Sequence, residues 1–173
     1  MLYVIFSVLA AVLLALDQWL KFWITANLPL GESMPFIPGL VELLTVHNYG
    51  AAWSVLSEAT WLLTIFSIVM TLGVCYFYYL KRNEMKPLYK IVTVFIITGA
   101  IGNLIDRAFA GKVTDFINFN FFYFFDASFP IFNIADMFVV VAMIGIIILC
   151  LFDKDFDKIL SLKKKNKNDS SSN

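Results

Sequence analysis

The sequence predicts an all-α integral membrane protein with four transmembrane helices, and its composition and hydropathy pattern lead to this class. Of its 173 residues, 60% are hydrophobic and 15% are charged, and the mean hydropathy is +0.79. A soluble domain of this length would carry less apolar and more charged surface. Four apolar runs approach the roughly 20 residues that cross a bilayer. The formal net charge is zero, so nothing suggests nucleic acid as a partner.

The first predicted span covers residues 2 to about 24. Its stretch "SVLAAVLLAL" has the small residues of a signal-peptide cleavage site, but it lacks a basic leading region and polar residues follow within the same helix. We therefore expect a retained membrane anchor rather than a cleaved signal peptide. The remaining spans are expected at about 61–80, 91–105 and 134–152.

Basic residues predict the orientation of these spans. Four lysines and arginines lie in the link 81–90 and six in the segment after the fourth span, whereas residues 25–59 contain none. The positive-inside rule therefore places the link and both termini in the cytoplasm. We expect residues 1–160 to form one four-helix transmembrane domain, and residues 161–173 to form a basic, disordered cytoplasmic tail.

Two outward-facing segments connect the spans. In residues 25–59, proline and glycine exclude one long helix, and "GLVELLTVHN" predicts a small β-like segment between the first and second spans. In residues 106–133, the aromatic stretch "NFNFFYFFDASFP" favours an interfacial loop. Both segments are apolar enough to rest on the outer leaflet or to cover a cleft between the helices.

Polar residues gather at the outer ends of the predicted spans, although each charge in a bilayer costs about 2.5–3.5 kcal/mol on insertion scales. Asp17 and Lys21 are spaced i, i+4 and can pair on one helical face. The other members of this group are Asn103, Asp106, Arg107, Asp115, Asn133 and Asp136. The cytoplasmic halves of the spans are nearly free of such residues, so we expect a site that opens to the outer leaflet rather than an ion pathway.

Asp115 and Asp136 are the best candidates for a catalytic carboxylate pair. They approach the same boundary from two sides of a short connection, and neither has a basic neighbour in the sequence. Two close carboxylates share one proton, so one can activate water while the other donates to a carbonyl oxygen. Asp17 beside Lys21, and Asp106 beside Arg107, are expected to be paired instead.

Simpler interpretations stay open for several of these residues. Asp17 with Lys21 could be a structural ion pair, and Asn103 and Asn133 could only hydrogen-bond between helices. Asp126 is expected to be an exposed loop acid, and His47 a loop residue. Cys75 and Cys150 lie in apolar runs and are expected to be packing residues.

The chain resembles a known family, the prolipoprotein signal peptidases of bacteria, also called signal peptidase II. The resemblance covers nearly the whole chain, and five short motifs carry it in the family's order and spacing. They are "DQWLK" (17–21), "HNYGAAWS" (47–54), "GAIGNLIDR" (99–107), "VTDFINF" (113–119) and "FPIFNIADMF" (129–138).

The resemblance implies an aspartic endopeptidase of the bacterial cell membrane, with Asp115 and Asp136 as the catalytic pair near the outer face. The implied substrates are diacylglyceryl-modified prolipoproteins, cut just before the lipidated cysteine. The family's other partners are membrane lipid and cyclic peptide antibiotics that occupy the dyad. No metal or cofactor and no oligomer beyond a monomer are implied. The residues that correspond to its substrate-binding or site-supporting positions are Asp17, Lys21, Asn48, Gly50, Asn103, Arg107 and Asn133.

Two features of the sequence depart from the family's usual form. Trp53 stands where phenylalanine is frequent, and residues 116–130 are unusually rich in phenylalanine.

Other functions predict different patterns of polar residues. A small transporter would place acids at several depths, and a structural or assembly protein would need no carboxylate pair. A serine protease using Ser54 and Lys21 is disfavoured, because Lys21 is expected to pair with Asp17.

Overall fold

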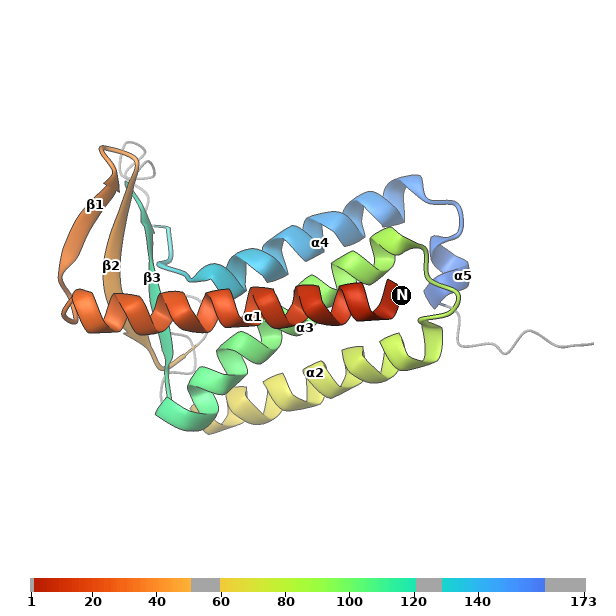
Figure 1. Ribbon diagram of the computed structural model, residues 1–173, viewed down its shortest axis with the longest axis horizontal. Coiled ribbons are helices and arrows are strands. Elements are labelled where there is room, and N and C mark those ends of the chain that lie inside the picture. The colour runs from red at the N-terminus through yellow and green to blue at the C-terminus, as the bar shows by residue number, and fades with distance from the viewer. Residues whose placement is uncertain (1, 51–59, 121–128, 161–173) are drawn as a thin grey trace, which may run out of the picture.

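The computed structural model describes residues 2–50, 60–120 and 129–160, and Figure 1 shows a helical bundle with a small sheet across one end. Within these ranges, four helices are long and apolar enough to cross a membrane. They are α1 (Leu2–Asn27), α2 (Thr60–Lys81), α3 (Pro87–Ala110) and α4 (Ile134–Phe152). The predicted four-helix membrane protein is therefore confirmed.

Helix α3 is the central element of the bundle, because α1, α2 and α4 all pack against it. Pro87 opens it at the first turn, and Gly111 ends it in the left-handed conformation with φ 68°. The helix extends beyond the predicted span 91–105 at both ends. Its last turns carry the charged residues at 106 and 107, which an apolar-run criterion leaves out although they continue the helix.

The sheet joins the two outward-facing segments. It contains β1 (Ser33–Ile37), β2 (Val41–Asn48) and β3 (Val113–Phe119) in that order, and both pairings are antiparallel. The predicted β-like segment thus corresponds to β1 and β2. The interfacial loop expected between the third and fourth spans also contains a strand, β3, which pairs with β2. His47, expected in a loop, lies in β2 opposite Thr114.

A small apolar cluster closes the end of the bundle opposite the sheet, where the N-terminus also lies (Figure 1). There the short helix α5 (Phe156–Leu160) contributes Ile159 to a buried apolar cluster with Met85 and Tyr89. Lys86 Nζ lies 2.9 Å from Asp153 Oδ1 and 3.1 Å from Asp155 Oδ2. The hydrogen bond from Lys86 lowers the pKa of Asp153.

Several sequence-based expectations are not tested by the structure. Trp53, Ser54, Asp126 and the tail 161–173 lie outside the described residues. Both cysteines are free thiols, with Cys75 partly buried and Cys150 exposed on the apolar surface.

Candidate active site

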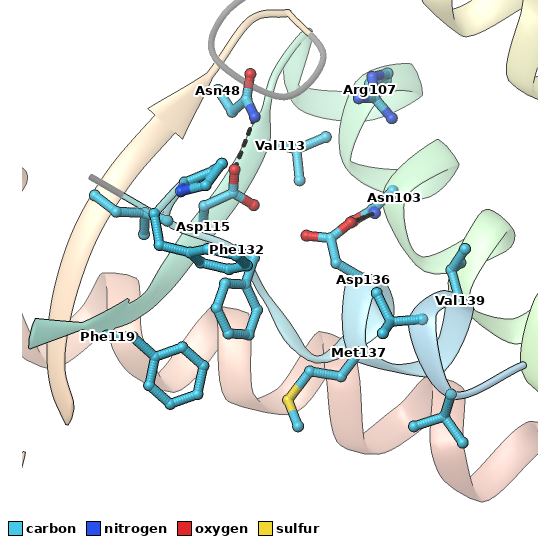
Figure 2. A pocket seen from close by; sticks show the side chains of 15 residues that line it. Asn48, Asn103, Arg107, Val113, Asp115, Phe119, Phe132, Asp136, Met137 and Val139 are labelled. Carbon is cyan, nitrogen blue, oxygen red and sulfur yellow. Dashed lines mark hydrogen bonds between the residues drawn. The ribbon is translucent and has the colours of Figure 1, made fainter. Parts of the chain in front are cut away.

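The site lies where β3, the end of α3 and the start of α4 meet beneath the sheet. Figure 2 shows five polar side chains around one pocket, those of Asn48, Asn103, Arg107, Asp115 and Asp136. The pocket has a volume of about 590 Å³, and its wall beyond these polar groups is apolar. That wall is formed by Val113, Phe119, Phe129, Pro130, Ile131, Phe132, Met137, Val139, Val140 and Val141.

Asp136 is fixed by the way α4 begins. Asn133 is the N-cap in extended conformation, and its side-chain oxygen accepts from the backbone N–H of Asp136 at 3.1 Å. In return, Asp136 Oδ2 accepts from the backbone N–H of Asn133 at 3.0 Å. This reciprocal capping box satisfies two amides of the first turn. It also directs the carboxylate back toward the helix end, where the pocket lies.

Asp115 reaches the same pocket from β3. Asn48 on β2 lies opposite Val113, so its side chain is on the same face as Asp115, two residues further along β3. Asn48 Nδ2 donates to Asp115 Oδ2 at 2.8 Å (Figure 2). Asp115 is only 3% exposed. Burial, and next the nearby charge of Asp136, raise the pKa of Asp115 to about 6.

Asn133 connects the two carboxylates. Its side chain is fully buried, and its Nδ2 donates to Asp115 Oδ1 at 2.6 Å while its backbone N–H holds Asp136. The two aspartates that sequence analysis selected are thus brought together by a third residue. Asn103 and Asn133 do bond to each other between α3 and α4, as the simpler interpretation expected, but both also bond to carboxylates.

A buried ionic cluster lies behind the pocket. Lys21 Nζ lies 3.0 Å from Asp17 Oδ2 and 3.0 Å from Asp106 Oδ2. The expected Asp17–Lys21 pair is therefore present. The expected pairing of Asp106 with Arg107 was wrong, because Asp106 turns toward α1 and bonds to Lys21 instead.

Asp17 also ties α1 to α4. Its Oδ1 accepts from the backbone N–H of Ala135, in the first turn of α4, at 3.0 Å. The carboxylate fits against α3 only because residue 102 is glycine, since a Cβ at Gly102 would lie 2.6 Å from Asp17 Oδ2.

Gln18 is a member of this cluster that sequence reasoning missed. Its Nε2 donates to Asp17 Oδ2 at 3.1 Å, to Asp106 Oδ1 at 3.2 Å and to the backbone oxygen of Gly102 at 3.2 Å. An uncharged amide beside Asp17 in an apolar helix was the signal that could have revealed it.

Arg107 and Gly50 lie at the rim of the pocket nearest β2. Arg107 Nη2 donates to the backbone oxygen of Gly50 at 3.2 Å, and the N–H of Gly50 donates to Asn48 Oδ1 at 2.9 Å. The buried Nε of Arg107 has no hydrogen-bond partner among the described residues.

His47 contacts Lys112 beside this rim. The two nitrogens, His47 Nδ1 and Lys112 Nζ, lie 3.0 Å apart. Partial burial and the charge of Lys112 lower the pKa of His47. Over the described ranges, histidine, cysteine, aspartate and glutamate side chains form no group of three or more suited to holding a metal ion.

Four spanning helices and a pocket with buried carboxylates at one end define a multi-pass membrane protein with an enzyme-like site. The family described as signal peptidase (SPase) II matches residues 9–152 of the chain. Lipoprotein signal peptidases of Enterococcus faecalis and Halalkalibacterium halodurans are 38% and 35% identical to it. The first match covers 88% of this chain and 91% of that protein, and the second covers 94% and 99%.

Solved structures agree with this assignment. Two structures of a bacterial membrane enzyme each superpose with a TM-score of 0.76, at 31% and 32% identity. They cover 92% and 86% of this chain and 93% of their own chains. The chain belongs to the signal peptidase II family and is a membrane-embedded peptidase. The resemblance found in the sequence motifs is confirmed.

Proposed function

We propose that this protein removes signal peptides from diacylglyceryl-modified prolipoproteins, cutting just before the lipidated cysteine with Asp115 and Asp136 as an aspartic dyad. The observation that carries the proposal is the shared partner of the two carboxylates. Asn133 bonds to Asp115 through its side chain and to Asp136 through its backbone N–H. Both acids line one pocket.

The chemistry follows from one proton shared by the dyad. The ionised carboxylate removes a proton from water as the water oxygen attacks the scissile carbonyl carbon, and the protonated carboxyl donates to the carbonyl oxygen. When the tetrahedral intermediate collapses, the C–N bond breaks and the leaving nitrogen takes a proton from the dyad. Because the two acids supply both proton transfers, the proposed reaction uses no metal or cofactor.

The shape of the pocket supports a lipid-linked substrate. Its apolar wall continues from the dyad along α4 to Met137, Val140 and Val141, which are exposed on the bundle surface where membrane lipid would lie. An acylated cysteine could enter from the outer leaflet with its chains in contact with this wall. The guanidinium of Arg107 and the amide of Asn48, which both line the pocket, would then orient peptide carbonyls.

The proposed location is the bacterial cell membrane, with both termini in the cytoplasm and the dyad near the outer face. The basic residues at 81, 82, 86 and 90 lie at the end of the bundle opposite the sheet (Figure 1), as the positive-inside rule requires for this orientation. A monomer contains every residue that the proposed reaction uses. Cyclic peptide inhibitors of the family would bind in the same pocket.

Cleavage of a purified diacylglyceryl-modified precursor in detergent tests the proposal directly. Asp115→Asn and Asp136→Asn should each abolish the gel shift of the product while the variants stay folded. Glu32→Gln, which changes an exposed acid at the same end of the molecule, should cleave like the wild type. Substantial turnover by either dyad variant would remove that aspartate from the mechanism.

A comparison of substrates tests the lipid requirement. The same precursor without diacylglycerol should be cut poorly or not at all, because it has no acyl chains to contact the apolar wall. Equal rates on both precursors would contradict the proposed specificity and leave the dyad in place.

A further inference from the structure

We infer that Lys21 is a positioning residue that holds the Asn103 side-chain amide in the orientation that donates to Asp136. The inference rests on the proposed function, because it gives Lys21 a task in arranging the dyad. Among the described residues, Lys21 itself forms no hydrogen bond or ion pair with either aspartate of the dyad.

The surroundings of Lys21 provide the first step. Its side chain is 5% exposed, and its Nζ lies 3.0 Å from each of three acceptors, Asp17 Oδ2, Asp106 Oδ2 and Asn103 Oδ1. A lysine ammonium has three N–H donors, so each donor has one acceptor. The two carboxylates already outweigh the single positive charge of the ammonium. The contact with the neutral amide therefore serves something other than charge balance.

The surroundings of Asn103 provide the second step. Its Oδ1 accepts from Lys21 Nζ at 3.0 Å and from Asn133 Nδ2 at 3.1 Å, while its Nδ2 donates to Asp136 Oδ1 at 2.7 Å. A half-turn of the amide would place its NH₂ group against an ammonium and a second NH₂ group. It would also place its carbonyl oxygen against a carboxylate. All three contacts would become repulsive, so Lys21 and Asn133 together select one orientation.

The consequence reaches Asp136. Its Oδ2 is held by the capping box, and its Oδ1 is held by Asn103. The plane of the carboxylate is thus fixed at both oxygens before substrate arrives. If Asn103 were free to turn, only the capping box would remain. A displacement of about 1 Å at a reacting group can lower the rate roughly 100-fold.

The other two contacts of Lys21 lead elsewhere in the fold. Asp17 also accepts from the N–H of Ala135, and Asp106 Oδ2 accepts from the N–H of Thr114 at 3.2 Å. These bonds join α1 and α3 to the backbones of α4 and β3. A structural role of Lys21 would act through these carboxylates, whereas its positioning role acts through Asn103. The two roles can therefore be separated by mutation.

A double-mutant cycle between Lys21 and Asn103 tests the inference. Wild type, Lys21→Met, Asn103→Leu and the double variant are compared by kcat and KM per folded enzyme on the lipidated precursor. We expect kcat to fall about 10- to 100-fold in each single variant, with KM changed less than about 3-fold. In the Asn103→Leu background, Lys21→Met should lower kcat less than about 3-fold further.

Thermal unfolding of the same four proteins separates stability from positioning. A purely structural Lys21 would lower the unfolding temperature, and its effect on kcat would multiply with that of Asn103→Leu. Such multiplication would overturn the inference. So would a Lys21→Met enzyme with wild-type kcat.

A charge-balanced variant covers the case in which Lys21→Met does not fold. The Asp106→Asn background removes one buried carboxylate, so the added Lys21→Met change leaves the formal charge of the cluster as it is in the wild type. The cycle is then repeated in that background with the same expectations. Failure to fold in both backgrounds would show that Lys21 serves the fold, and would reject the positioning role.

Failure of the positioning role of Lys21 can be distinguished from failure of the proposed function. If the wild type does not cleave, or if Asp115→Asn or Asp136→Asn retains turnover, the dyad proposal fails. The positioning role of Lys21 rests on that proposal and fails with it. If the wild type cleaves and both dyad variants are inactive while the cycle is multiplicative, only the role of Lys21 fails.

Discussion

At the scale of single residues, each oxygen of the two site carboxylates accepts a hydrogen bond from an amide. The side chains of Asn48 and Asn133 donate to Asp115, and the side chain of Asn103 and the backbone of Asn133 donate to Asp136. Hydrogen bonds to an ionised group are worth about 1.5–3 kcal/mol each. These donors favour the charged forms, whereas burial opposes them, and the balance at Asp115 leaves a pKa of about 6.

The first residue-scale prediction concerns pH. If the dyad needs one shared proton, kcat/KM should fall as pH rises above about 6, where Asp115 loses its proton while the charge of Asp136 is already present. Asn48→Ala removes a donor to the charged form, so the pKa of Asp115 should rise further. The alkaline limb of the pH–rate profile should then move up by about one pH unit.

The control for this prediction is Asn27→Ala, which removes an exposed amide at the sheet end of α1. Its profile should match that of the wild type. An alkaline limb that stays in place or moves down in Asn48→Ala would contradict the electrostatic role given to Asn48.

At the scale of elements, the helices could be predicted from sequence and the third strand could not. Apolar runs of bilayer length identify α1, α2 and α4 almost to their ends, since only helices satisfy the backbone in hydrocarbon. Strand β3 pairs with β2, which comes from a different outward segment. Such a pairing leaves no local signal, and the phenylalanines around 116–125 favoured an interfacial loop instead.

The site shows the same division between local and long-range information. Their place at one membrane boundary, without basic neighbours, selected Asp115 and Asp136, and the i, i+4 spacing selected Asp17 with Lys21. The spacing within one helix could not show that Lys21 also reaches Asp106 on α3. The sequence therefore predicted that Asp106 pairs with its neighbour Arg107. The true contact depends on how α1 and α3 are rotated relative to each other, which spacing within one helix does not show.

The close contact of α1 with α3 gives an element-scale prediction. Gly102→Ala would place a methyl group 2.6 Å from Asp17 Oδ2 and 3.1 Å from the Cβ of Ala135. Such overpacking costs about 1–3 kcal/mol, so the unfolding temperature and the cleavage rate should both fall. Thermal unfolding in detergent and the gel assay measure the two effects.

Gly73→Ala on α2 is the matched control for this prediction. A Cβ at Gly73 would have no atom within 4 Å apart from its own helix and chain neighbours. Both variants add the same methyl group to a spanning helix. If Gly102→Ala proved as stable and active as Gly73→Ala, the contact of Asp17 with α3 would be looser than described.

At the scale of the whole molecule, the two ends of the bundle are built differently. One end carries the sheet and the polar site, while the other is closed by α5 and the ion pairs of Lys86 (Figure 1). Helix α3 runs between them and packs against every other spanning helix. The catalytic proposal uses residues only from the sheet end, and the closed end contributes stability.

Truncation tests this division of roles. We expect deletion of residues 161–173 to leave the unfolding temperature and cleavage unchanged, because the proposed peptidase domain ends at 160. Deletion of 153–173 should destabilise the protein by roughly 3 kcal/mol, since it removes the buried Ile159 and the contacts of Phe156. Equal unfolding temperatures for the two truncations would show that α5 adds no stability.

Labelling from one side of the membrane tests the proposed orientation. In a chain with Cys75 and Cys150 replaced by serine, Glu32→Cys should react with a membrane-impermeant maleimide added to intact cells or protoplasts. Lys154→Cys should react only after the membrane is opened. The reverse pattern would invert the topology and place the dyad at the cytoplasmic face.

Asn133 has three structural roles, and these have a consequence for drug resistance. This residue caps α4 and holds both carboxylates, so any substitution that evades a compound bound to it also damages the machinery that the compound blocks. Resistance to such a compound should instead arise in the apolar wall, for example at Phe132 or Met137, where side-chain size can change without loss of a hydrogen bond. A compound that takes its affinity from Asn133 therefore leaves the bacterium the fewest routes of escape.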